Sequence, residues 1–182
     1  MRKIILLFAL LLSIGSAAQG IDNTIHFVVN EIGESNVGFL TEDGKQSVIL
    51  SFPGKKANDL YTDVLIRTVR MFKSIPVAPQ VINGKAFVLS GETDDMRANT
   101  GLSSVSLVSL KYNILFEFKD GKIRVHAPEA PIGTQTVMGT GSTYTVRLSN
   151  IYKNDKEAIK KIEDFFQKLI NSIAFPNSDD NW

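Results

Sequence analysis

Few side chains in this chain are of the types that perform catalysis or bind metals, and they are scattered. There are only two histidines, His26 and His126, and no cysteine. The histidines could share a metal ion, or one could act as a general base. Both lie in segments with strand-like alternation, so we favour histidines without partners on a sheet surface. Cysteine catalysis is excluded, because the chain has no thiol.

The stretch from Gly91 to Gly101 carries a second group of candidates, the carboxylates of Glu92, Asp94 and Asp95. Carboxylate oxygens are ligands of Ca²⁺ outside cells, and a carboxylate pair can also support hydrolysis. The spacing lacks the ordered ligands and final glutamate of an EF-hand. We therefore favour a solvated acidic loop, and keep a carboxylate-dependent hydrolase that uses Glu92 with Asp94 or Asp95 as the alternative function.

A glycine-rich stretch contains Gly139, Gly141 and Ser142 and suggests a phosphate-binding loop. The lysine and the fixed spacing of such a loop are absent, so a flexible hairpin tip is the favoured interpretation. No G-x-S-x-G motif of a serine hydrolase occurs. The sequence thus assigns no catalytic, cofactor-binding or metal-binding residue, and it implies no cofactor.

The N-terminal segment has the order of a secretory signal peptide. Arg2 and Lys3 precede an apolar run over residues 4–12, and small residues follow up to Ala18. The run is shorter than the roughly 20 residues of a membrane-spanning helix, so we prefer a cleaved signal to a permanent anchor. We expect cleavage after Ala18 and a periplasmic or extracellular location, with no stable membrane span.

Composition limits the classes of partner and the organisation of the chain. Removal of Arg2 and Lys3 changes the formal net charge from +1 to −1, which gives no reason to expect a nucleic-acid partner. Without cysteine there is neither a lipoprotein anchor nor a disulfide framework. We expect a signal peptide over 1–18, a single α+β domain over 19–176 and a flexible tail over 177–182.

Alternating apolar residues predict an all-antiparallel set of strands. The strongest signal is a hairpin with Asp120 and Gly121 at its turn, whose first strand should place Ile114, Phe116 and Phe118 in the core. A separate polar loop is expected over 91–101. The predicted strands cover residues 24–30, 37–40, 46–52, 85–90, 102–110, 112–118, 135–138 and 144–151.

Two amphipathic helices are predicted by apolar residues at helical spacing. The first covers 58–74 with Asn58 as its N-cap, and the second covers 154–174 with Asn154 as its N-cap and Glu157 completing a capping box. On the second helix we expect the polar face, which includes Glu163, to point to water. Strands that alternate with two helices predict an α+β fold, an antiparallel sheet with both helices packed on one face.

Two stretches, SFPGKKANDLYTDVLIRTVRMF and SLKYNILFEFKDGKIRVHAPEA, carry a family resemblance. The first has a Leu-Tyr pair at the start of a helix, Leu60 and Tyr61, and the second is a hairpin from Tyr112 to Arg124. Together they resemble a domain-of-unknown-function family of secreted bacterial proteins with a TATA-binding-protein-like fold. The resemblance implies a curved antiparallel sheet with two helices packed on one face, and it implies no activity.

The sequence predicts a well-packed fold but no set of catalytic residues. This combination favours an exported, non-catalytic binding or interaction domain. Its ligand would be a protein, a peptide or a cell-surface component.

Overall fold

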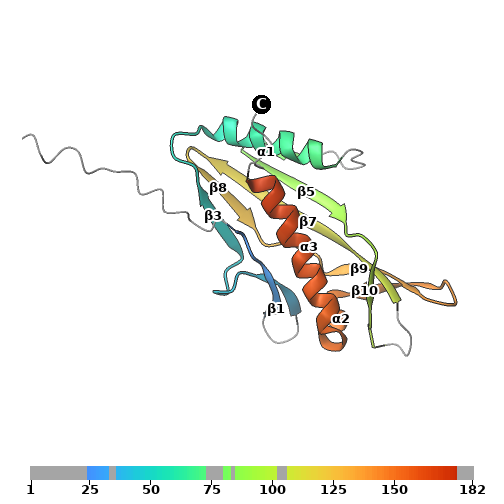
Figure 1. Ribbon diagram of the computed structural model, residues 1–182. Coiled ribbons are helices and arrows are strands. Elements are labelled where there is room, and N and C mark those ends of the chain that lie inside the picture. Colours follow the sequence, from blue (N-terminus) through green and yellow to red (C-terminus); the bar gives the residue numbers. More distant parts are fainter. Residues whose placement is uncertain (1–23, 33–35, 73–79, 83–84, 102–105, 176–182) are drawn as a thin grey trace, which may run out of the picture.

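The computed structural model describes residues 24–32, 36–72, 80–82, 85–101 and 106–175, so the predicted signal peptide and the whole of the predicted tail lie outside it (Figure 1). The helices are α1 (Ala57–Met71), α2 (Leu148–Asn154) and α3 (Lys156–Ala174). The strands are β1 (Val28–Ile32), β2 (Asn36–Leu40), β3 (Ser47–Ser51), β4 (Gln80–Ile82), β5 (Ala86–Glu92), β6 (Met96–Ala98), β7 (Ser106–Lys119), β8 (Lys122–His126), β9 (Ile132–Val137) and β10 (Thr143–Arg147).

The long strand β7 organises the main sheet, which is antiparallel and curved (Figure 1). One edge of β7 pairs with β9 along its first half and with β8 along its second half. The other edge pairs first with β6 and then with β5. Strands β10, β3 and β4 extend this sheet outward, whereas β1 and β2 form a separate two-stranded sheet.

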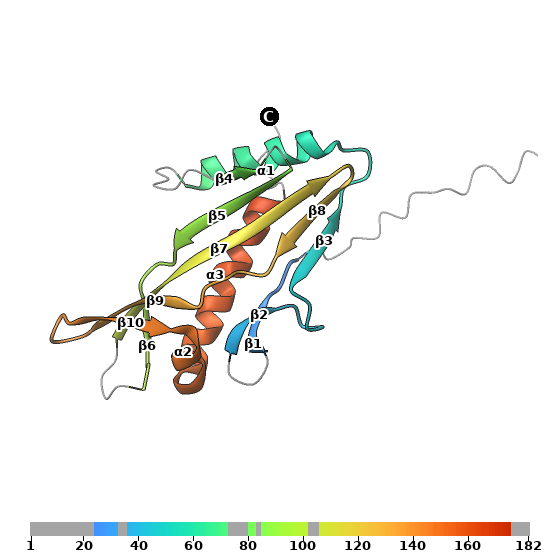
Figure 2. The same ribbon diagram turned by 180° about the vertical axis from the view of Figure 1, so that it is seen from behind.

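Helices α1 and α3 cover the same face of the main sheet. The Tyr112 ring of β7 packs edge-on against Phe166 of α3, with ring centroids 5.3 Å apart. Phe118, six residues along the same strand, packs against Tyr61 of α1 at 5.5 Å. Residues an even number apart on a strand point to the same side, so the predicted architecture is confirmed. We call this side the helix face and the other side the open face (Figure 2).

The predicted hairpin and its core are also confirmed. The turn residue Gly121 has a φ of 72°, in the region that glycine adopts without strain. Ile114 and Phe116 are fully buried and Phe118 is 3% exposed. The predicted break at residue 111 is wrong, because β7 continues through Lys111, which is simply an outward-facing strand position.

Three other elements differ from the sequence prediction. The predicted strand 144–151 ends at Arg147, and α2 follows, because Leu148 and Ile151 are buried three residues apart on one side of a helix. The short strands β4 and β6 were not predicted. Three residues are too few to show an alternating pattern.

The starts of both long helices depend on residues other than the predicted caps. α1 begins at Ala57 rather than Asn58, and the Ala57 amide donates to Asp120 Oδ1 of the β7–β8 turn over 3.0 Å. In α3 the N-cap is Asp155 rather than Asn154, and it accepts the Ala158 amide over 3.0 Å. An acceptor distant in sequence thus replaces the local cap at α1.

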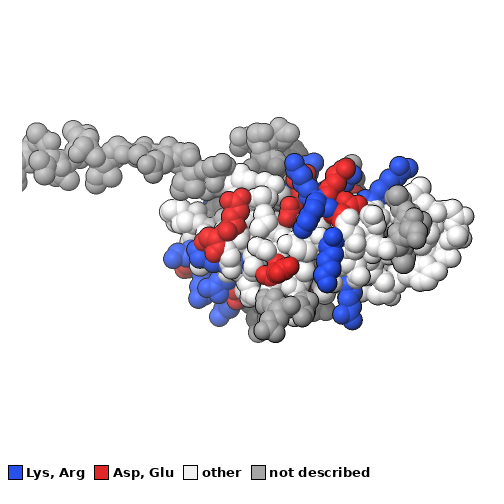
Figure 3. Space-filling view, turned by 90° about the horizontal axis from the view of Figure 1, so that it is seen from below, with Lys and Arg blue, Asp and Glu red and all other residues white. Residues whose placement is uncertain are grey.

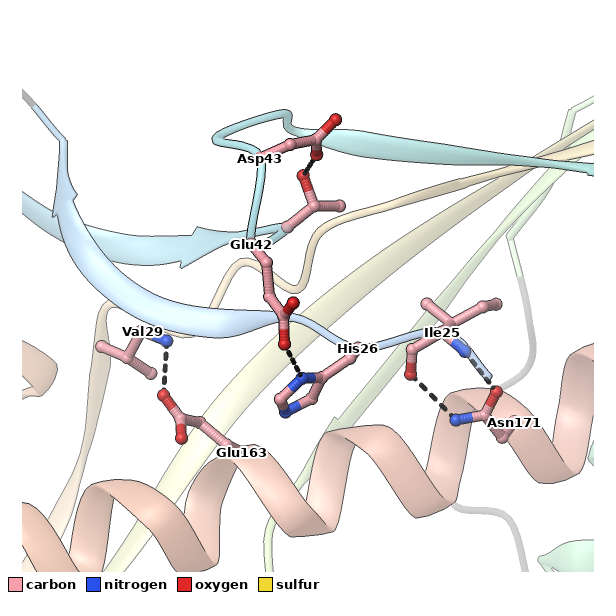
Figure 4. A network of polar contacts seen from close by, with 8 residues as sticks. Ile25, His26, Val29, Glu42, Asp43, Glu163 and Asn171 are labelled. Atoms are coloured by element: carbon pink, nitrogen blue, oxygen red, sulfur yellow. Dashed lines mark hydrogen bonds and ion pairs between the residues drawn. The ribbon is translucent and has the colours of Figure 1, made fainter. Parts of the chain in front are cut away.

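The segment that leads into β1 is attached to α3 by side-chain-to-backbone hydrogen bonds (Figure 4). Asn171 of α3 donates to the Ile25 carbonyl over 2.9 Å and accepts the Ile25 amide over 2.8 Å. Glu163 accepts the Val29 amide over 2.7 Å. The expectation that Glu163 points only to water is therefore wrong, because β1 covers that side of the helix and presents unpaired backbone donors to it.

Candidate functional site

The two histidines do not form a joint site. His26 Nδ1 lies 3.0 Å from Glu42 Oε1, just before β1 (Figure 4). His126 Nε2 lies 2.8 Å from Glu117 Oε2, at the end of β8. Each histidine has its own carboxylate partner, so the prediction of histidines without partners is wrong. Within the described ranges, no group of three histidine or carboxylate side chains is arranged to hold a metal ion.

The predicted acidic loop is in large part held in the sheet. Glu92 ends β5 and accepts the Ser109 hydroxyl over 2.6 Å. Thr93 is buried and exchanges two hydrogen bonds with Leu110, each 2.9 Å long. Asp94 and Asp95 lie in the connection between β5 and β6. The three carboxylates of the predicted loop therefore come from two different parts of the chain, the end of β5 and the connection that follows it.

The glycine-rich stretch after β9 forms a hairpin tip, as favoured from the sequence. Gly139 and Gly141 have φ values of 102° and 70°, and the Val137 amide donates to the Ser142 carbonyl over 2.9 Å. The backbone amide of Val137 is thus used within the hairpin, which then returns along β10.

The main candidate site is a hollow of about 720 Å³ at the middle of the main sheet, which we call the mid-sheet hollow. Its apolar wall is formed by side chains from the end of α1, from β5 and from the start of β9. Its polar lining comes from β5, β7 and the connection between β8 and β9. The lining residues are Phe72, Leu89, Ser90, Gly91, Glu92, Lys111, Tyr112, Asn113, Glu129, Pro131 and Ile132.

The polar lining is ordered by the register of the sheet. Ser90 lies opposite Asn113 and donates its hydroxyl to Asn113 Oδ1 over 2.6 Å. Asn113 is in turn bridged to Glu129 by two backbone hydrogen bonds of 2.9 Å. One row of polar side chains therefore crosses the sheet, and Glu92 and Lys111 form the opposed pair of the next row.

A second hollow of about 400 Å³ adjoins the first, because Ser90, Asn113 and Glu129 line both. His126 also lines the second hollow, and its partner Glu117 accepts from Arg124 over 3.2 Å. The hydrogen bond from His126, with a smaller contribution from Arg124, lowers the pKa of Glu117.

This arrangement does not resemble a hydrolytic triad. The Ser90 hydroxyl donates to Asn113, and Nε2 of His126 is hydrogen-bonded to the Glu117 carboxylate. A triad requires the serine hydroxyl to donate to the histidine. The polar groups of the two hollows can hold a ligand by hydrogen bonds, but their geometry does not activate a nucleophile.

Unlike Ser90, Lys111 and Asn113, Tyr112 points its ring to the helix face. Burial, assisted by the negative charge of Asp94, raises the pKa of Tyr112 to about 12. The phenol therefore stays protonated near neutral pH and can act as a hydrogen-bond donor.

Sequence reasoning missed the hollow because its residues come from four separate segments. Ser90, Lys111 and Asn113 read in the sequence as ordinary outward positions of strands. The sequence marks these residues in one way: they are polar, and they alternate with strongly apolar residues along the same strand. That pattern does not indicate which outward residues become neighbours, since strand register decides it.

The surface charges and helices add two observations. In the view from below, basic and acidic side chains of the described residues are interspersed and lie next to one another in places, so this side has no broad basic area of the kind that binds nucleic acid (Figure 3). Among the helices of the described part of the chain, none combines the length and apolar character of a membrane span.

Comparison with known proteins gives two solved structures and no sequence relative. No family model matches the chain, and no curated protein matches it. A TBP-like protein from Parabacteroides distasonis is similar with a TM-score of 0.48 and 9% identity, over 72% of this chain and 92% of that one. A DUF4468 family protein from Bacteroides ovatus is similar with a TM-score of 0.47 and 15% identity, over 82% and 92% of the two chains. Their descriptions, a TBP-like protein and a member of a family of unknown function, are of the kind that the sequence resemblance implied, and neither description includes an activity.

Proposed function

We propose that this protein is an exported, non-catalytic binding domain whose ligand occupies the mid-sheet hollow. The observation that carries the proposal is the composition of this hollow. Apolar side chains such as Phe72 and Ile132 stand beside a row of hydrogen-bonding groups on a rigid sheet. Ligand sites in proteins typically combine apolar walls with a few placed polar groups.

The exposure of Ile132 supports this proposal. It is a large apolar side chain that is 47% exposed although it belongs to a strand of the main sheet. An exposed apolar residue at the rim of a hollow contributes to binding, because a ligand that covers it removes apolar surface from water.

The alternative, a hydrolase that uses Glu92 with Asp94 or Asp95, has less support. Glu92 lines the hollow, whereas Asp94 and Asp95 are not among the lining residues. An enzyme of this kind needs both carboxylates within reach of one substrate bond.

Export is proposed from the N-terminal pattern of basic, apolar and small residues. N-terminal sequencing of the protein recovered outside the cytoplasm should give Gln19 as the first residue. Recovery of intact Met1 on membrane-bound protein would contradict cleavage.

Binding is tested by comparing two exposed isoleucines of the same sheet. Ile132→Asp alters the hollow, and Ile49→Asp is the matched control, since Ile49 is 56% exposed on β3 and does not line the hollow. Immobilised protein is incubated with surface extract of the producing cell. A partner should be retained by the wild type and by Ile49→Asp, and lost with Ile132→Asp.

Circular dichroism and thermal melts should show that both variants fold. Equal retention by Ile132→Asp and Ile49→Asp would show that the hollow is not the binding site. Turnover of a substrate that is lost in Glu92→Gln would favour the hydrolase.

A further inference from the structure

The strand β10 forms one edge of the main sheet, and in the described part of the chain it pairs only with β9. The Leu148 amide donates to the Pro131 carbonyl, in register with the β9–β10 pairing. The bonding direction alternates along an antiparallel strand, so the backbone groups of Thr143, Thr145 and Arg147 point away from β9. One edge of β10 is therefore open to a further strand.

The hairpin that ends in β10 lacks the residues that protect many sheet edges. Natural edge strands are commonly shielded by charged side chains, above all lysine, or by proline. No residue from Ile132 to Val146 is charged or is a proline. The residues of β10 itself, Thr-Tyr-Thr-Val-Arg, are mostly of types that favour strands. The hairpin also extends beyond the helices, where another chain can approach it (Figure 1).

Tyr144 is the exposed aromatic residue of this edge. Its side chain is 53% exposed, whereas Val146, which points to the same side of the strand, is 3% exposed. The buried apolar layer of the molecule thus ends between these two residues. A strand added at the edge would cover part of the Tyr144 ring and remove apolar surface from water.

The open edge of β10 is complementary to the same edge of a second copy. In an antiparallel pair centred on Thr145, each Thr145 faces the other, and Thr143 faces Arg147 of the second copy. These are the residues whose backbone groups point outward, so every facing pair can exchange hydrogen bonds. The two Arg147 side chains stay about 13 Å apart along the strands, because each faces a threonine four residues from the other arginine.

The same pairing places Tyr144 beside Val146 of the second copy. Aromatic and β-branched side chains on adjacent strands form favourable pairs. The strand β3, which pairs only with β8 in the described ranges, is less suited to such pairing. Lys45 and Lys55 flank it, and lysines protect an edge strand from pairing.

We propose that two copies of this protein associate through their β10 strands and form one continuous antiparallel sheet. The inference does not depend on the proposed function, because it concerns the edge of the sheet and leaves the ligand of the hollow open. A five-residue edge buries less surface than a standard protein interface, so the association should be weak and should depend on concentration.

A single introduced cysteine tests the register, because the chain has none of its own. Thr145→Cys places two thiols opposite each other, on residues whose Cα atoms are about 5.5 Å apart, within the range of a disulfide. Thr143→Cys is the matched control on the same exposed strand, and its two thiols would lie about 13 Å apart along the strands. Under mild oxidation Thr145→Cys should form a disulfide-linked dimer, and Thr143→Cys should stay mostly monomeric.

Sedimentation velocity at increasing protein concentration measures the association without an added thiol. The wild type should shift from monomer to dimer. Tyr144→Lys should weaken the dimer roughly tenfold, because the dimer loses two aromatic contacts and gains two charges at the edge. Ile49→Lys is the matched control, since Ile49 is 56% exposed on the edge strand β3, and it should leave the association unchanged.

Four results would overturn the proposed pairing. The first is a wild type that stays monomeric at every concentration, and the second is equal cross-linking of the two cysteine variants. The third is an association that Ile49→Lys weakens and Tyr144→Lys does not. The fourth is a wild-type monomer that retains a protein from the surface extract which Tyr144→Lys loses, because the edge would then bind a different chain.

Discussion

The two faces of β7 show how one strand serves two purposes. On the helix face Ile114 and Phe116 are fully buried beneath the helices. On the open face Lys111 and Asn113 are exposed and line the mid-sheet hollow. Because neighbouring residues point to opposite faces, the buried core and the polar lining of the hollow are encoded in alternate positions of the same strand. Substitutions at adjacent positions should therefore separate the two properties.

On the helix face, the largest loss of stability is expected from a substitution of Phe166. It is fully buried and its ring contacts Phe39, Tyr112 and Phe165. Phe166→Ala should lower the free energy of unfolding by about 3 to 5 kcal/mol, because it removes a large side chain and leaves a cavity. Urea unfolding measures the difference. A melt that barely moves would show that the α3 contact does not hold this face together.

The comparison of faces is sharpest at two adjacent residues of β7. Ile114→Ala should cost about 2 to 4 kcal/mol, as for a fully buried aliphatic side chain. Leu115→Ala, on the half-buried open face, should cost only about 1 kcal/mol. Both are measured by the same urea titration. Equal costs would contradict the assignment of the core to one side of the sheet.

A smaller effect is expected where β1 joins the helix layer. Asn171→Ala removes both hydrogen bonds to the backbone of Ile25 and should cost about 1 to 2 kcal/mol. Amide exchange at Ile25 and Val29 should accelerate. Lys160→Ala, an exposed position on α3, is the control and should change neither quantity. Unaltered exchange at Ile25 in Asn171→Ala would mean that apolar packing alone secures this segment.

The smallest loss of stability is expected from a substitution of Asp155, and its size should depend on pH. Its carboxylate accepts the amides of Ala158 and Asn99, and these bonds lower its pKa, the one from Ala158 most. A lowered pKa in the folded state adds stability that is complete above the unfolded pKa and is lost as the pH falls through the folded value.

Asp155→Asn keeps one side-chain acceptor oxygen and should cost about 1 kcal/mol at pH 7. The difference from wild type should shrink as the pH falls below about 4, the ordinary aspartate pKa, and through the lowered pKa of the folded protein, where the wild-type carboxylate becomes protonated. Urea midpoints at both pH values measure this. A difference that is independent of pH would show that the carboxylate charge does not contribute.

Local patterns were sufficient to predict much of this fold. The turn at Asp120 and Gly121, the core face of β7 and the two long helices follow from periods of 2 and 3.6 residues. The prediction failed where a neighbour distant in sequence intervenes. Leu148 begins α2 although strand-like residues precede it, and Asp120 caps a helix that starts 63 residues earlier.

The sequence by itself determined which residues of each element face the core, because that depends only on the spacing of apolar side chains along the chain. Tertiary structure alone decided which outward residues meet. Strand register places Ser90 beside Asn113 and the ring of Tyr112 across Gly91. The folded chain also pairs the two histidines with different carboxylates. Spacing along a strand is a local property, whereas the pairing of strands depends on contacts between distant segments, so the hollow exists only in the folded sheet.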